Sequence, residues 1–359
     1  MTPYFVFFAV EFALIMMCAS IKAPQQRQIA IFSAIFLMTF FSGLRDLVGF
    51  DTGGYHAIFR GLDLTSFSLD DWLPFEPLFS INMWIIKFIF DDPNILMLYV
   101  SIIQGWILYL ICRRQTRAWI FLLIYLSGFY LQNQFNIVRA GVAGLLLVYA
   151  YILRKEEKDN TIILIGAFLF HYSALFVCFF LIRGKRSFNT VLFVGSVLIA
   201  IFLLKGGDRV VEKLAYYFLE SDYYSSGSIF IGPYFVVTTS LMMLTHFMVF
   251  RRDGVLPHAI LFVVLALKLL QMLFPVLWRV YDLYYFIWFA AIGYAVSNRY
   301  TNPKALAIVA LSVVNFWFLT LASLVYEEES LAGRVNQTGE FALFDNESPL
   351  VPYKTFVGK

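Results

Sequence analysis

The sequence predicts an all-α, polytopic integral membrane protein, and three observations support that fold class. Of the 359 residues, 60% are hydrophobic and only 14% are charged, whereas a soluble domain has about 45–50% apolar and about 25% charged residues. The mean hydropathy of the chain is +0.75. Long apolar runs, each bounded by a short polar cluster, recur from the first residues almost to the last. A soluble fold could not cover this much apolar surface with so few charges.

Roughly ten to twelve of these runs are candidate transmembrane helices, because a helix that spans a membrane needs about 20 mostly apolar residues. In chain order, the candidates are residues 2–21, 29–44, 76–90, 94–112, 118–131, 136–153, 161–182, 190–204, 229–250, 258–274, 281–297 and 305–325. We therefore expect residues 1–325 to form a single transmembrane domain with external loops at 45–75 and 205–228. The tail at 326–359 ends in the apolar sequence SPLVPYKTF and is expected to dock on the external face.

The distribution of Lys and Arg predicts the orientation of the chain, since short cytoplasmic loops carry an excess of these residues. The basic clusters are assigned to the cytoplasm and the acidic stretches at 45–76 and 326–359 to the outside, so both termini are expected outside. This orientation fits every loop when the segments near 76–90 and 161–182 are re-entrant, which gives about ten crossings. The alternative is a plain twelve-span protein with one loop that violates the rule.

The composition argues against several other classes of protein. A net charge of +3, with Lys and Arg in short scattered clusters, offers no basic surface to a nucleic acid. The three cysteines are far apart in the sequence, and the four histidines lack the spacing typical of metal ligands. The sequence therefore predicts no disulfide framework, no metal site and no cofactor.

The first polar cluster is GLRDLVGFDTGGYHAIFRG at 43–61, which follows the second candidate span and so lies at the external membrane surface. Arg45 offers a guanidinium that can bind a phosphate or diphosphate through two parallel hydrogen bonds. Asp51 adds a carboxylate, Tyr55 adds an aromatic ring, and the glycines allow close approach of the backbone. The alternative is a capped interfacial loop in which the arginine only reaches toward the head groups.

The second cluster is FYLQNQFNIVRAGVAG at 129–144, a polar island between two apolar runs. Amide and guanidinium groups are costly in hydrocarbon and usually face a cavity or one another. If a helix begins at Gln132, then Gln132, Asn136 and Arg139 share one of its faces, with Gln134 beside them. Such a face could bind a sugar or a phosphate, and a polar turn between two spans is the alternative.

A lone histidine, His171, lies near the middle of the apolar run GAFLFHYSALF at 166–176. A histidine in that position can accept a proton or contact a polar ligand at the bottom of a cavity. The alternative is a histidine that only bonds a neighbouring helix. Glu76, at the end of the first external loop, is a further candidate for accepting a proton.

A third polar cluster, FPVLWRVYDLYYF at 274–286, begins a span at its external end. Arg279 and Asp282 stand three residues apart there, among several aromatic residues that include Tyr281. This combination suits a lipid phosphate or a sugar ring that stacks on an aromatic face, and an internal ion pair is the alternative. Tyr353 and Lys354 belong to the tail that is expected to dock on the same face.

Taken in chain order, these motifs resemble the EpsG family of Wzy-type polysaccharide polymerases. The resemblance rests on the ordered segments GLRDLVGFDTGGYHAIF, FEPLFSINMWII, NQFNIVRAGVAG, GAFLFHYSALF, LWRVYDLYYF and PLVPYKTF. The chain departs from the family pattern at Thr52, where an aromatic residue often follows the aspartate, and in the separation of Gln134 from Arg139.

The resemblance implies both a fold and an activity. The expected protein is a GT-C-like glycosyltransferase of the bacterial inner membrane, which polymerises oligosaccharide repeat units on undecaprenyl diphosphate at the external face. Donor and acceptor are both lipid-linked, and neither a nucleotide sugar nor a metal ion is expected. The implied product is an O-antigen, a capsule or an exopolysaccharide, and chain-length regulators and flippases are the implied protein partners.

This hypothesis assigns a role to each candidate residue. Arg139 and Arg279 would bind the diphosphate in one pocket open to the outside, Arg45 would position the donor or acceptor, and His171 or Asp51 would be the base. The residues expected to bind substrate are Arg45, Tyr55, Glu76, Gln132, Gln134, Asn136, Tyr281, Asp282, Tyr353 and Lys354. The alternative functions are a flippase for lipid-linked oligosaccharides and an O-antigen ligase-like enzyme.

Overall fold

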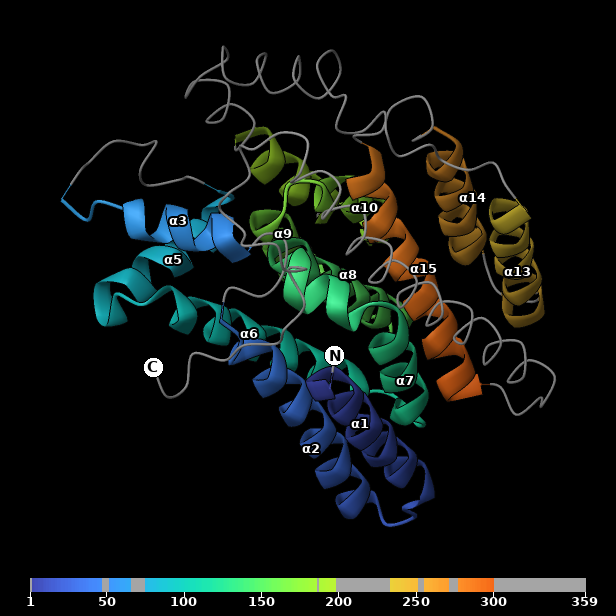
Figure 1. The fold of residues 1–359 in the computed structure, drawn as a ribbon. Helices are drawn as coiled ribbons and strands as arrows, with labels where there is room; N and C mark the ends of the chain where they lie inside the picture. Colours follow the sequence, from blue (N-terminus) through green and yellow to red (C-terminus); the bar gives the residue numbers. More distant parts are fainter. Residues whose placement is uncertain are drawn as a thin grey trace. The chain divides into compact units, whose positions relative to one another are not determined.

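The computed structural model describes residues 2–46, 52–65, 75–185, 187–197, 233–250, 255–270 and 277–299 (Figure 1). The chain divides into two compact units. The first comprises residues 1–67, 79–142 and 309–359, and the second comprises residues 68–78 and 143–308. Every regular element in the described ranges is a helix. The chain is therefore an all-α membrane protein, as the composition predicts.

The described helices follow the predicted spans closely. They are α1 (Thr2–Ser20), α2 (Pro24–Gly43), α3 (Thr52–Gly61), α5 (Pro77–Phe90), α6 (Pro93–Cys112), α7 (Ala118–Gly128), η1 (Gln132–Asn136), α8 (Val138–Lys155), α9 (Thr161–Phe170), α10 (Ala174–Leu181), α13 (Pro233–Phe250), α14 (Val255–Leu270) and α15 (Trp278–Arg299). A further helix covers Ser187–Val197. The candidate span at 305–325 and the tail at 326–359 lie outside the described residues.

By length and composition together, α6 alone among the described helices is a candidate to cross a membrane unaided. The apolar helices α5, α7 and α9 have only 14, 11 and 10 residues. These three helices are shorter than the roughly 20 residues that a membrane-spanning helix needs, and the number of crossings stays a prediction.

The helix α3 lies within residues 45–75, which the sequence predicts to be an external loop. Its buried residues are Thr52, Tyr55, His56 and Phe59, which follow the i, i+3, i+4, i+7 spacing of an amphipathic helix. This apolar face packs against α6. The spacing was visible in the sequence, but two adjacent glycines and a polar context favoured a loop there.

The first unit is built on the close packing of α2 along α6, with α1 beside α2 and α7. Small residues allow this approach, as is common between membrane helices. A Cβ added at Gly105 of α6 would collide with the Oγ1 atom of Thr39 on α2. That hydroxyl is held in place because it donates a hydrogen bond to Ile35 O at 2.7 Å.

The second unit joins α13, α14 and α15 through a directed chain of hydrogen bonds. Trp288 Nε1 lies 3.1 Å from His246 Nδ1, and His246 Nε2 lies 2.9 Å from His258 Nδ1. An indole N–H can only donate, so His246 Nδ1 accepts and its Nε2 carries the proton. His246 therefore donates to His258, and the three helices are linked by side chains with fixed tautomers.

The segment at 161–182 turns back on itself, as a re-entrant segment must. Helices α9 and α10 are separated by a break at His171–Ser173 and pack against each other. Asn160 Nδ2 donates to Leu181 O at 2.9 Å, so the two ends of the segment meet. At 1.5 Å per residue the arms are about 15 Å and about 12 Å long, about half the thickness of a bilayer core.

In this helical hairpin, α9–α10, the chain reverses direction, and the re-entrant placement of the hairpin in a membrane stays a prediction. The other segment proposed as re-entrant, at 76–90, is the single helix α5 of 14 residues. Its re-entrant placement stays a prediction.

The Gly105→Ala substitution should destabilise the first unit by about 1–3 kcal/mol, because the new methyl group must displace Thr39. The thermal unfolding midpoint in detergent measures this loss, and a second substitution, Thr39→Ala, should recover part of it. Gly128→Ala is the matched control, since a Cβ there would have no atom within 4 Å. Equal midpoints for both glycine variants would contradict the packing argument.

Candidate functional site

The polar island at 129–144 is an interruption between α7 and α8. The chain passes through the π-helical turn η1, in which Ile137 N donates to Gln132 O at 2.9 Å, five residues back. In an α-helix, Ile137 N would instead donate to Asn133 O, four residues back. Asn133 O therefore lacks its usual α-helical partner. A helix inside an apolar bundle tolerates such a break only where other groups satisfy the freed carbonyls.

Gln104 of α6 supplies the missing hydrogen bonds. Its Nε2 atom donates to Asn133 O at 3.1 Å and to Val138 O at 2.9 Å, and the side chain is fully buried. Gly141 allows the amide to approach, since a Cβ there would collide with Asn133 O and lie 2.8 Å from Gln104 Nε2. Gln104 therefore fixes the point at which α8 begins.

Gln134 and Arg45 are both enclosed within the first unit rather than presented on a surface. Gln134 accepts a hydrogen bond from Ser42 Oγ at 2.6 Å and donates to Tyr125 Oη at 3.3 Å. Arg45 donates to Ser42 O and lies with its guanidinium carbon 5.0 Å from the centre of the Phe135 ring. Both side chains are fully buried, and their contact with substrate stays a prediction.

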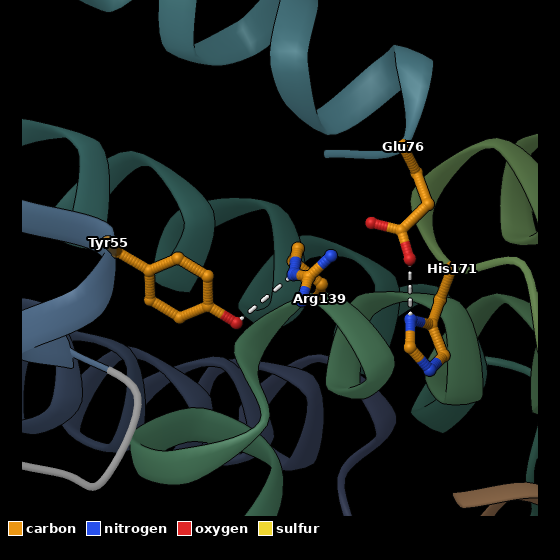
Figure 2. A network of polar contacts seen from close by, with 4 residues as sticks. All are labelled: Tyr55, Glu76, Arg139 and His171. Carbon is orange, nitrogen blue, oxygen red and sulfur yellow. Dashed lines mark hydrogen bonds and ion pairs between the residues drawn. The ribbon is translucent and has the colours of Figure 1, made fainter. Parts of the chain in front are cut away.

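Arg139 occupies the second position of α8 and is half-buried. Its Nε atom donates to Tyr55 Oη at 3.2 Å (Figure 2). Its guanidinium carbon lies 5.6 Å from the Tyr55 ring centre and 5.9 Å from the Phe79 ring centre. These two rings, 5.5 Å apart, form one wall beside the cation. The guanidinium is thus oriented by one hydrogen bond and two aromatic contacts.

The amides Gln132 and Asn136 pair with each other next to the same helix start. Asn136 Nδ2 donates to Gln132 Oε1 at 3.2 Å. Asn136 is buried and Gln132 is partly exposed. Gln132 and Asn136 are therefore neighbours, in a π-helical turn rather than in an α-helix, and a face that they share with Arg139 stays a prediction.

Glu76 and His171 form a buried pair in the second unit. His171 Nδ1 lies 2.9 Å from Glu76 Oε1 (Figure 2), and the two side chains are 11% and 6% exposed. Glu76 directly precedes α5, and His171 ends α9 at the apex of the α9–α10 hairpin. Because a carboxylate only accepts hydrogen bonds, His171 Nδ1 carries a proton, and Nε2 of the neutral ring is left as an acceptor.

Among the described residues, the second ring nitrogen of His171 has no hydrogen-bond partner. A carboxylate behind Nδ1 and an Nε2 that no other side chain occupies are the arrangement that a general base requires. The pair can accept a proton at Nε2 and stabilise the resulting imidazolium through Glu76.

The structure describes two of the remaining predicted site residues. Tyr281 and Asp282 lie in the first turns of α15 and are half-buried, with Tyr281 stacked on Tyr285 at 5.5 Å between ring centres. The other predicted site residues, or their side chains, lie outside the described part of the chain: Asp51, Arg279, Tyr353 and Lys354. The convergence of Arg139 and Arg279 in one pocket stays a prediction, as these residues belong to different units.

Residues 28–337 match the model of the EpsG family. The chain belongs to the EpsG family. This is a family of Wzy-type, polysaccharide polymerase-like proteins. A search of curated proteins and a search of solved structures found no match to the chain.

Two residues that position this EpsG-family site were not identified from the sequence. Gln104 is a single amide in an apolar helix, and its role appears only when the break before α8 is known. Phe79 is one of 40 phenylalanines, and nothing local distinguishes it from a core residue. In the described part of the chain, no cluster of three or more His, Cys, Asp or Glu side chains could hold a metal ion.

The Gln104→Leu substitution should lower the free energy of unfolding by about 1–3 kcal/mol, because it removes two buried hydrogen bonds from a side-chain amide to backbone carbonyls. Gln115→Leu is the matched control. Gln115 is also buried, but neither of its amide atoms has a hydrogen-bond partner, so its loss should be neutral or stabilising. Thermal unfolding in detergent compares the two, and an equal loss in both variants would contradict the assigned role of Gln104.

Proposed function

We propose that this EpsG-family protein is a glycosyltransferase that polymerises oligosaccharide repeat units carried on undecaprenyl diphosphate. The reaction would take place at the external face of the bacterial inner membrane, with chain-length regulators and flippases as partner proteins. The observation that carries the proposal is the Glu76–His171 pair, which leaves His171 Nε2 without a hydrogen-bond partner among the described residues. A polymerase needs a base of this kind, because the acceptor is a sugar hydroxyl.

The proposed reaction forms one bond and breaks one. The acceptor hydroxyl oxygen attacks the anomeric carbon of the donor sugar, and the bond between that carbon and the diphosphate oxygen breaks. Undecaprenyl diphosphate leaves with the bonding electron pair. The hydroxyl proton passes to His171 Nε2, so atoms and charge are balanced without a metal ion or a nucleotide.

His171 is favoured as the base over Asp51 because its surroundings suit proton transfer. The hydrogen bond from Nδ1 to Glu76 holds the ring in one tautomer and one orientation. When Nε2 takes up the proton, the Glu76 carboxylate lies next to the new positive charge. Side chains positioned for general base catalysis typically contribute about 10²–10⁴-fold to the rate.

Arg139 is the proposed contact to the diphosphate leaving group. A guanidinium matches the geometry of phosphate oxygens, and it stabilises the negative charge that develops as the bond breaks. Its place at the second residue of α8 adds the partial positive charge of a helix N-terminus. The hydrogen bond from Nε to Tyr55 fixes the plane of the guanidinium. Arg279, Arg45, Tyr281 and Asp282 remain predicted contributors to substrate binding.

Arg139→Ala should abolish the polymer while leaving single repeat units, since the leaving group loses its cation. The measurement is a gel of products formed by purified protein in liposomes that contain a lipid-linked repeat unit. Arg139→Lys should retain part of the activity, because it keeps the charge but loses the planar fork.

Arg113→Ala is the matched control for this experiment. Arg113 is an exposed arginine just after α6 and should not affect the product ladder. Wild-type chain lengths in Arg139→Ala would remove Arg139 from the mechanism. Movement of the lipid-linked unit across the membrane by the wild-type protein, with no ladder, would indicate a flippase instead.

His171→Ala should lower the initial rate of polymerisation by at least about 100-fold, because the group that takes the proton of the acceptor hydroxyl is removed. Glu76→Gln keeps an oxygen acceptor for Nδ1 but removes the charge, so a smaller loss of roughly ten-fold is expected. Initial rates of polymerisation measure both effects. A wild-type initial rate in His171→Ala would exclude His171 as the base.

A further inference from the structure

The carbonyl end of α10 is held by side chains from outside the helix. The last carbonyls of any helix lack intrahelical donors, and at this end of α10 Cys178 O accepts from the backbone of the C-cap, Ile182 N, at 2.9 Å. Three carbonyls that follow, those of Phe180, Leu181 and Ile182, accept hydrogen bonds from side chains instead.

Two residues provide these donors, and we call Arg154 and Asn160 the carbonyl clamp. Arg154 Nη1 donates to Phe180 O at 2.6 Å and to Ile182 O at 2.7 Å. Asn160 Nδ2 donates to Leu181 O at 2.9 Å and to Ala150 O at 3.1 Å. The clamp therefore ties the end of α10 to the last turns of α8 and to the start of α9.

The clamp is specific in its chemistry. A cation near a helix C-terminus interacts favourably with the helix dipole, which suits Arg154. Asn160 is 1% exposed, and its Oδ1 atom is buried without a hydrogen-bond partner. Only the Nδ2 group of Asn160 forms hydrogen bonds, and both of its partners are backbone carbonyl oxygens. The side chain at position 160 must therefore be a hydrogen-bond donor.

In the α9–α10 hairpin, the position of the C-terminal end of α10 affects the position of His171 at the apex. His171 N is bonded to Ala167 O at 3.0 Å and Ala174 N to His171 O at 2.9 Å, so the backbone of His171 is continuous with both short helices. A shift of α10 at its clamped end would therefore move His171 relative to Glu76. The 2.9 Å contact between their side chains tolerates only a few tenths of an ångström before the hydrogen bond weakens.

We propose that Arg154 and Asn160 are positioning residues, which keep His171 at the apex of the α9–α10 hairpin in hydrogen-bond contact with Glu76. This inference rests on the proposed role of His171 as the base. A small misplacement of a reacting group can cost about 100-fold in rate, so the clamp would act on kcat rather than on substrate binding.

The decisive variant is Asn160→Asp, which preserves the shape of the side chain but turns its donor into an acceptor. It should lower kcat for polymerisation about ten-fold or more with KM changed less than about two-fold, because a carboxylate facing two carbonyls repels them. Arg154→Ala should act in the same direction, and Arg154→Lys should recover part of the loss because an ammonium can donate to the same oxygens. Lys158→Ala is the matched control, since this exposed side chain of the same loop pairs with Glu156 and should leave the rate unchanged.

A double-mutant cycle separates positioning from general stability. In a His171→Ala background, which retains only the residual rate, Asn160→Asp should cause no further loss, because the group that it positions is gone. A further loss equal to that in the wild-type background would overturn the proposal. So would a wild-type kcat in Asn160→Asp and Arg154→Ala while His171→Ala is impaired, and the proposed function would then stand. A wild-type rate in His171→Ala would overturn both.

Discussion

The structure depends on the requirement that a membrane protein satisfy its own backbone hydrogen bonds wherever a helix is interrupted. Gln104 meets that requirement before α8, where its amide donates to two carbonyls on either side of the break. Because those carbonyls are satisfied, α8 can begin at Val138 inside the bundle, with Arg139 in its first turn. The position of the candidate cation is thus set by an amide on a different helix.

The second unit meets the same requirement with different residues. The break between α9 and α10 leaves His171 in an extended conformation at the apex, and the far end of α10 receives its donors from the clamp. In both units, an interruption in an apolar segment brings an ionisable side chain to a defined place. Side-chain donors that replace backbone donors keep each interruption in a single geometry.

The sequence predicts the fold and part of the site, for reasons that can be traced to individual residues. Hydropathy locates the helices because length and apolarity are local properties of the chain. Arg139 and His171 stand out because charged or titratable groups are rare in apolar runs. Their partners do not stand out: Glu76 lies 95 positions from His171 and Tyr55 lies 84 positions from Arg139. No local pattern encodes such a pairing.

A predicted position near the membrane surface does not determine whether an arginine is accessible to a ligand, as Arg45 and Arg139 show. The same reasoning, a guanidinium beside the external leaflet, selects both residues as phosphate ligands. In the structure, Arg45 is fully buried against Ser42 O and the Phe135 ring, and binding an anion would require the core of the first unit to open. Arg139 is only half-buried, and the Tyr55 hydroxyl orients its guanidinium without enclosing it. The tertiary contacts of each side chain decide between these outcomes: Arg45 packs against Phe135, whereas Arg139 lies beside Tyr55 and Phe79. Such contacts join residues far apart in the sequence, so the local composition does not reveal them.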